Sequence, residues 1–455
     1  MTLRTEVKAS LVLALPIALT QVGQMSMGFI DTVMVGRLGS EPLASIALGS
    51  AMFFSVGIVC LGIILALEPM VAQAYGADDH EPIGRYTRQG MWLAVFLTVP
   101  VVVLFWFAEP VLLALGQDPN IVTGTAAYLR AVSPGFVAWL WFVALRGLLE
   151  GLHRPRLVTL VMAGGVALNI GANYVLMFGH LGFPALGIVG TGYATTIVYW
   201  YYVLALAAIV QLQPAFRQYG VFAHLRGPDW ATIKEIARLG WPIGVSLGLE
   251  ATLFTVTALM VGWLGTDILA AHQMALQAAA LTFTVPLGIG IAASVRVGHA
   301  MGRGDREGAR WAGWTAVGLA GCFMLAAALT FWLAPEAVIH LFIDIHDPAN
   351  AEVVRMAVAM LGVAAVFQLF DGTQATANGA LRGLKDTRVP MLICLAAYWI
   401  VGLPVGYVLG FPIGWEGVGL WWGLVAGLAV AAVALSVRFH RQVHVATLYA
   451  DAAEK

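Results

Sequence analysis

The chain has 455 residues, of which 60% are hydrophobic and 11% are charged. So few charged residues cannot cover the surface of a water-soluble globular protein of this length, which excludes that class. The 24 basic and 25 acidic residues nearly cancel, which gives no indication of nucleic-acid binding. Three cysteines without a CxxC pair argue against a zinc site or a disulfide framework. The composition is typical of an all-α polytopic membrane protein.

Apolar stretches recur along the chain, and a helix needs about 20 such residues to cross a bilayer. They predict about twelve transmembrane helices. Their approximate limits are 9–36, 46–74, 88–109, 122–146, 157–179, 187–212, 236–262, 268–297, 309–334, 351–382, 389–411 and 416–438.

The basic residues alternate between the predicted connections. Of the 24, 21 lie in the even-numbered connections or at the termini, and only Arg37, Arg130 and Arg355 lie toward the other side. Because short cytoplasmic connections are enriched in Lys and Arg, we expect both termini to be cytoplasmic.

Four short motifs occur twice in the same order. LPI at 15–17, MVGRLG at 34–39 and AYG at 74–76 return as WPI at 241–243, MVGWLG at 260–265 and AMG at 300–302. LEGL at 149–152 returns as LRGL at 381–384. We therefore predict an N-terminal six-helix bundle (1–212), a cytoplasmic linker (213–235), a C-terminal six-helix bundle (236–443) and a cytoplasmic tail (444–455).

Two six-helix halves in the same orientation predict a parallel repeat about an axis along the membrane normal. Proteins built in this way place their substrate near the middle of the membrane, between the halves, and rock one half against the other. The duplication therefore indicates a secondary transporter.

Two acids lie where the bilayer is least polar. Glu250 follows Arg238 by 12 residues, which is about 18 Å along a helix, and Asp371 precedes Arg382 by 11 residues. Two carboxylates in a pocket of low dielectric repel each other unless a proton or a cation neutralises them. The pair is therefore a candidate site for H⁺ or Na⁺; the alternative is two acids hydrogen-bonded within a packed core.

A third acid, Asp31, lies roughly 9 Å along its helix from Arg37. Asn169, Asn173 and Thr191 are candidate hydrogen-bond partners, and a buried acid among neutral groups is a protonatable switch. Solvation or pairing with Arg37 is the alternative. Candidates for the lining of a substrate cleft are Gln24, Phe254, Phe283 and Phe367.

At these residues the chain resembles the multidrug and toxic compound extrusion (MATE) family, in particular its NorM-type bacterial members. The motifs are MGFIDTVMVG at 27–36, PMVAQ at 69–73, Glu250, FQLFD at 367–371 and ALRG at 380–383. The resemblance implies a MATE-like fold in the bacterial inner membrane and efflux of organic cations and aromatic drugs by antiport against H⁺ or Na⁺. It also implies that Glu250 and Asp371 bind the coupling ion and that Asp31 is a protonation switch.

One position departs from the family pattern. Similar proteins can have a tyrosine four residues before the tenth-span aspartate, where this chain has Phe367. The missing hydroxyl removes one oxygen ligand, which favours protons, or both ions, over sodium alone.

The expected mechanism is alternating access. An ion neutralises Glu250 and Asp371 in the outward-facing state, the cationic drug leaves, and the halves rock inward to release the ion. We expect small organic cations and membrane lipids as partners, no nucleic acid, a monomer, and no cofactor besides the coupling ion.

Other functions are less compatible with the sequence. It contains no Walker loop and no HExxH motif, which argues against an ATP-driven pump and against an enzyme. The alternative is a flippase for lipid-linked precursors, which has a similar architecture but is expected to need a strongly basic cavity.

Overall fold

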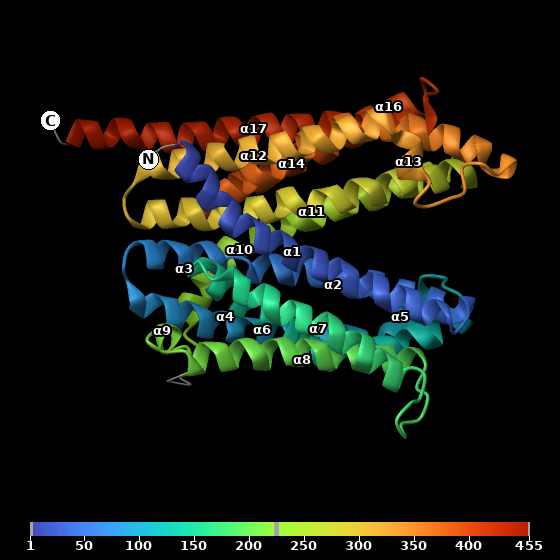
Figure 1. Cartoon of the computed structure of the whole chain (residues 1–455), viewed down its shortest axis with the longest axis horizontal. Helices are drawn as coiled ribbons and strands as arrows, with labels where there is room; N and C mark the ends of the chain where they lie inside the picture. The colour runs from blue at the N-terminus through green and yellow to red at the C-terminus, as the bar shows by residue number, and fades with distance from the viewer. Residues whose placement is uncertain (1–2, 223–226, 454–455) are drawn as a thin grey trace. The chain divides into compact units, whose positions relative to one another are not determined.

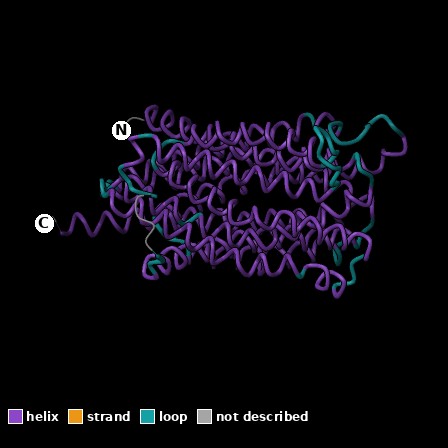
Figure 2. Tube along the Cα trace, turned by 90° about the horizontal axis from the view of Figure 1, so that it is seen from below, coloured by secondary structure: helices purple, strands orange, loops and turns teal. Residues whose placement is uncertain are grey.

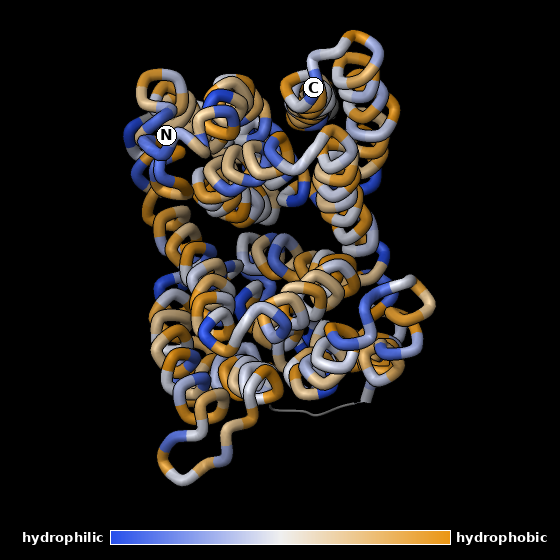
Figure 3. The backbone as a smooth tube through the Cα atoms, turned by 90° about the vertical axis from the view of Figure 1, so that its right-hand side faces the viewer, coloured by the Kyte–Doolittle hydropathy of each residue, from blue (hydrophilic) through white to orange (hydrophobic). Residues whose placement is uncertain are grey.

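The described part of the chain, residues 3–222 and 227–453 of a computed structural model, contains helices and loops and no strand (Figure 2). A helix satisfies its own backbone hydrogen bonds, as hydrocarbon surroundings demand. Hydrophobic residues recur along these helices (Figure 3). In this part of the chain, twelve helical segments are long and apolar enough to cross a membrane, and each matches one predicted span. The predicted all-α polytopic fold is confirmed.

The chain divides into two compact units, each described here by itself (Figure 1). The N unit is Leu19–Gly244, and the C unit is the described part of Met1–Ala18 together with that of Val245–Lys455. The N unit contains α2 (Ser40–Ile64), α3 (Leu67–Gly76), α4 (His80–Trp106), α5 (Ala108–Ala114), α6 (Pro119–Gly151), α7 (Pro155–Leu176), α8 (Ile188–Leu212) and α9 (Pro214–Arg217). The C unit contains α11 (Thr266–Gly302), α12 (Arg306–Leu333), α13 (Pro335–Ile339), η1 (Pro348–Asn350), α14 (Ala351–Gly383), α15 (Arg388–Leu395), η2 (Ala396–Gly402), α16 (Leu403–Gly410) and α17 (Glu416–Ala453).

Two helices contribute to both units. The boundary falls inside α1 (Leu3–Gly36), after Ala18, and inside α10 (Trp230–Gly262), after Gly244. Each helix carries a proline, Pro16 or Pro242, close before that boundary. The predicted limits of the two halves remain a prediction. Residues 223–226 of the predicted linker and 454–455 of the predicted tail lie outside the described residues.

The two units repeat one packing pattern. In the N unit α6 packs against α2, α4 and α8, and in the C unit α14 packs against α11, α12 and α17. These are the second, third, fourth and sixth membrane spans of each half. The sequence duplication therefore extends to the tertiary contacts, with one central helix in each unit.

The N-terminal part of α1 is held in the C unit by polar and close apolar contacts. Glu6 is buried and forms an ion pair with Arg296 of α11. Further along, Gly288 of α11 approaches Ala18 so closely that an added Cβ would lie 2.8 Å from its backbone nitrogen. The opposite charges of Glu6 and Arg296 attract each other, which offsets part of the free-energy cost of burying them.

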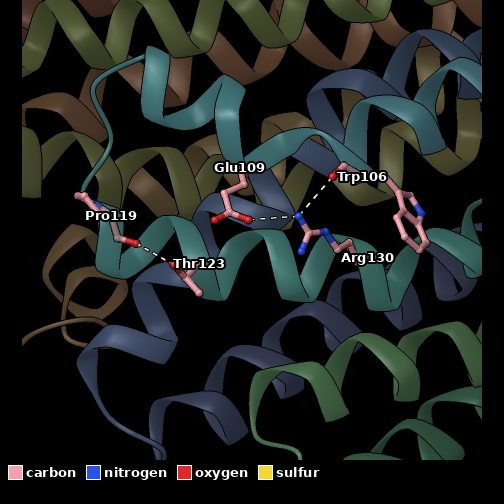
Figure 4. Close-up of polar contacts among 5 residues, drawn as sticks. All are labelled: Trp106, Glu109, Pro119, Thr123 and Arg130. Carbon is pink, nitrogen blue, oxygen red and sulfur yellow. Dashed lines mark hydrogen bonds and ion pairs between the residues drawn. The ribbon is translucent and has the colours of Figure 1, made fainter.

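The short helix α5 is tied to α6 by a partly exposed ion pair (Figure 4). Arg130 donates to Glu109 Oε2 at 3.2 Å and to the carbonyl of Trp106 at 3.4 Å. Thr123 donates to the carbonyl of Pro119 within the first turn of α6. An exposed ion pair contributes about 0–1 kcal/mol, so Arg130 positions α5 more than it stabilises the fold.

The start of α10 is capped by Asp229. Its carboxylate accepts from the Thr232 hydroxyl at 2.6 Å and from the Ala231 N–H at 3.1 Å, and the Thr232 bond in particular holds the pKa of Asp229 below its usual value. The N–H of Asp229 donates to Gln89 of α4 at 2.8 Å. The end of the linker is therefore tied to the N unit. The capping by the Asp229 carboxylate, and not this backbone bond, is lost as the pH falls through the lowered pKa.

A seam of glycines joins η2 and α16 to α17. A Cβ added at Gly423 would lie 2.2 Å from the Cα of Gly406, and one at Gly402 would lie 3.2 Å from the Cα of Gly427. Small residues let membrane helices approach this closely and gain van der Waals contacts.

Gly423→Val is expected to lower the thermal stability of the detergent-solubilised protein, because the new side chain forces α16 and α17 apart. Overpacking of this kind costs about 1–3 kcal/mol. The matched control is Gly318→Val on α12, where an added Cβ meets nothing within 4 Å. Equal thermal unfolding of the two variants would show that the seam does not depend on close approach.

Candidate functional site

Asp31 of α1 lies buried in the N unit within a set of hydrogen-bond donors. Its Oδ1 accepts from Nδ2 of Asn169 at 3.0 Å and from Nδ2 of Asn173 at 2.7 Å. Its Oδ2 accepts from the Thr195 hydroxyl at 3.5 Å. The two asparagines are four residues apart on α7 and therefore share one helix face. The structure thus brings together three of the four N-unit residues predicted around this switch.

The predicted contact of Thr191 is wrong. Thr191 donates to Sδ of Met177 at 3.2 Å, and Thr195, one turn later on α8, contacts Asp31 in its place. Residues four apart occupy the same face of a helix, so the sequence does not distinguish these two threonines.

Three tyrosines also lie within electrostatic range of Asp31: Tyr128 of α6 and Tyr199 and Tyr202 of α8. Tyr199 packs beside Phe53 and Trp139 inside the N unit, with ring centroids 6.4 and 6.5 Å away. Membrane-interface belts are rich in tyrosine, and the sequence alone gives no reason to assign these three to the interior.

The C unit brings together the two acids predicted near mid-membrane. Asp371 of α14 is 4% exposed, Glu250 of α10 is half-buried, and the two carboxylates interact electrostatically. Gln374, three residues after Asp371 and on the same helix face, hydrogen-bonds Glu250. Arg382 also faces Glu250. Two acids and one guanidinium therefore share this region, whereas the sequence suggested two acids alone.

A phenol hydroxyl completes this group. Tyr398 of η2 is buried, and its oxygen accepts from Nε2 of Gln374 at 2.8 Å. Gln374, Arg382 and Tyr398 were not predicted as members of the site. Arg382 resembled a marker of the cytoplasmic edge, and the other two are neutral side chains that hydropathy and charge do not single out.

The candidate lining residues lie in different places. Phe367 is 2% exposed and packs edge-on against Trp421 and Phe254, with centroids 5.5 and 6.1 Å away. Phe283 is a half-buried residue of the C unit, and Gln24 is a half-buried residue of the N unit. Phe254 and Phe367 thus form part of one aromatic cluster in the C unit.

No group of three or more His, Cys, Asp or Glu side chains in the described residues is arranged to hold a metal ion. The oxygen-bearing residues near Glu250 and Asp371 are instead mixed in type, with carboxylates, an amide and a phenol. A monovalent cation or a proton suits such a set better than zinc, which prefers nitrogen and sulfur.

Comparison with known proteins shows which family this chain resembles. The MatE family model matches residues 16–175 and 242–408, one stretch in each half. The chain is 42% identical to "Probable multidrug resistance protein NorM" of Mesorhizobium japonicum, over 97% of this chain and 95% of that protein. It is 41% identical to "Multidrug resistance protein NorM" of Burkholderia vietnamiensis, over 94% and 92%.

The fold has a close counterpart among solved structures. The crystal structure of the eukaryotic MATE transporter AtDTX14 matches with a TM-score of 0.86 at 23% identity, and the match covers 97% of this chain and 98% of that one. Because the family model matches both halves and the NorM relatives align over nearly the whole chain, this multi-pass membrane protein belongs to the MatE family.

Proposed function

We propose that this chain is a multidrug efflux antiporter that exports organic cations and aromatic drugs in exchange for H⁺ or Na⁺. It acts as a monomer in the bacterial inner membrane, surrounded by lipids, with both termini in the cytoplasm. The names of its NorM relatives and the structural likeness to a MATE transporter support this proposal.

The observation that carries the proposal is the grouping of Glu250, Asp371 and Arg382 in the C unit. With all three ionised, the group has a net charge of −1. An uncompensated charge inside a membrane protein costs several kcal/mol, so the group favours uptake of one proton or one monovalent cation.

Neutralisation of this charge provides the coupling. A cationic drug is attracted while the group is negative and loses that attraction once a proton or Na⁺ is bound. Because binding couplings are reciprocal, the drug also lowers the affinity for the ion. Exchange of one cation for the other follows from competition for one negative charge.

Asp31 supplies a second site for a proton in the N unit. When ionised, its carboxylate accepts from two amides and one hydroxyl. A protonated carboxyl must donate one hydrogen, and the amide oxygens of Asn169 and Asn173, which have no hydrogen-bond partner among the described residues, are suitable acceptors after reorientation. Protonation of Asp31 therefore changes the hydrogen bonds between α7 and α1, which makes Asp31 a candidate switch.

The proposal is tested with purified protein in liposomes that carry ethidium. Proton and sodium gradients are imposed separately, and ethidium movement is followed by fluorescence. We expect the proton gradient to drive ethidium transport, and collapse of that gradient with an ionophore to stop it. No transport under either gradient would contradict the proposal and favour a flippase, which a labelled lipid-linked precursor in the same liposomes would reveal.

A further inference from the structure

The eleventh membrane span is interrupted by a π-helical segment, η2, between α15 and α16. Pro404 follows it closely and has no N–H to donate to the carbonyl of Ile400, so the regular α-helical bond is missing at this point. A wider π turn accommodates this, and such turns are rare and are found frequently at functional sites. Gly402, at the end of η2, belongs to the glycine seam against α17, which anchors the segment.

The buried hydroxyl of η2 is that of Tyr398. Its oxygen accepts from Nε2 of Gln374 at 2.8 Å, and the Cys394 thiol, one turn earlier, is a second hydrogen-bond partner. A tyrosine hydroxyl has one hydrogen. When this hydrogen is directed to the Cys394 sulfur, the Tyr398 oxygen can only accept, so the Gln374 side chain must turn its amide nitrogen toward Tyr398.

Gln374 connects this hydroxyl to the acid pair. An amide nitrogen has two hydrogens, and that of Gln374 is directed to Tyr398, with Glu250 as the second hydrogen-bond partner of this side chain. Its Oε1 has no hydrogen-bond partner in the described part of the chain. A short path of hydrogen bonds therefore runs from η2 through α14 to α10.

Charged and titratable groups reach Glu250 and Tyr398 from three of the neighbouring elements. They are Asp371 and Arg382 of α14, Cys394 of α15 and Tyr398 of η2. Between Glu416 and Arg438, α17 has no titratable residue. The response of Glu250 to ions is therefore governed by few partners, and Gln374 is the non-titratable side chain that contacts it.

We propose that Tyr398 and Gln374 are positioning residues that set how readily Glu250 takes up the coupling ion, an inference that rests on the proposed function. The amide N–H favours the ionised carboxylate, and the phenol keeps the amide from turning its oxygen toward Glu250. Position 367 of this chain is a phenylalanine, and Tyr398 brings a phenol oxygen to the acid group from a different helix.

Tyr398→Phe removes one oxygen and keeps the ring. Without it the amide can turn, Glu250 loses its donor, and its neutral form is favoured. The proton concentration for half-maximal ethidium efflux is expected to fall about threefold or more, because the lost hydrogen bond had stabilised the ionised form of Glu250. Ethidium affinity, measured in detergent at a pH well above the midpoint, where Glu250 is ionised in both proteins, is expected to stay unchanged.

The matched control is Tyr407→Phe, the same substitution in the same membrane span at an exposed residue. Gln374→Met is a second variant, which keeps the side-chain length, removes the amide and is expected to shift the titration in the same direction. If Tyr398→Phe and Gln374→Met both titrate like the wild type, the inference is overturned. A loss of efflux and of ethidium binding with an unchanged midpoint would overturn it as well. Wild-type protein that moves ethidium under neither gradient would mark a failure of the proposed function and remove the inference with it.

Discussion

Glu250→Gln and Asp371→Asn are each expected to abolish ion-driven ethidium efflux in liposomes while leaving the protein folded. The amides are close in shape to the acids but carry neither a titratable proton nor a negative charge. Efflux is expected to fall by at least about 100-fold. Couplings between two bound ligands usually change an affinity by about 5- to 150-fold, so this loss corresponds to a strong coupling between ion and drug.

The two substitutions are expected to differ in their effect on drug binding. Arg382 and one remaining acid form a neutral pair in each variant, so the attraction for a cationic drug is weakened in both. Glu250 is half-buried and Asp371 is 4% exposed, so Glu250→Gln removes the more accessible charge. Ethidium affinity is therefore expected to fall more in Glu250→Gln, as fluorescence polarisation in detergent would measure.

Exposed acids of the same unit provide the controls. Glu336→Gln and Asp267→Asn make the same chemical changes at exposed positions of α13 and α11. Both are expected to transport ethidium at the wild-type rate. If Glu250→Gln and Asp371→Asn do so as well, the coupling ion binds elsewhere and Asp31 becomes the leading candidate.

The sequence predicted the acidic centres because a carboxylate within an apolar stretch is costly wherever it lies. Asp31, Glu250 and Asp371 stand out for this reason, and the spacing of Asn169 and Asn173 places both on one face of α7. Thr195 was missed because the register of α8 against α1 depends on side-chain packing, and hydropathy does not encode it.

The residues that were missed reach the sites through local structure that composition does not reveal. Tyr398 lies in a π segment whose one sequence signal is Pro404. Arg382 marks the end of a span by its charge, yet it lies close enough to Glu250 to interact with it electrostatically. In each case the position along the chain was predictable and the direction of the side chain was not.

The end of the fourth span was also predicted too early. It was placed at Arg146, whereas α6 continues to Gly151 and buries both Arg146 and Glu150, which are 4% and 0% exposed. Nε of Arg146 lies 3.4 Å from Glu150 Oε2, and its Nη1 donates to Gln21 at 3.4 Å. Residues four apart on a helix can pair in this way, and the pair allows the helix to continue where charge had suggested a loop.

Arg146→Met is expected to destabilise the protein by about 3–5 kcal/mol, because it leaves Glu150 buried without its guanidinium. Neither carboxylate oxygen of Glu150 has a hydrogen-bond partner among the described residues, so little else compensates the charge. Unfolding in mixed micelles with increasing denaturant measures this change in the free energy of unfolding.

The pair Glu81 and Arg85 provides a matched control, since it has the same spacing and the same N–O distance of 3.4 Å but is exposed. Arg85→Met is expected to cost less than about 1 kcal/mol. The double variant Arg146→Met with Glu150→Leu removes both charges and is expected to recover most of the lost stability, because apolar side chains of similar volume can replace a buried ion pair. A double variant as unstable as Arg146→Met would mean that the packing of the arginine side chain, and not its charge, holds this end of α6.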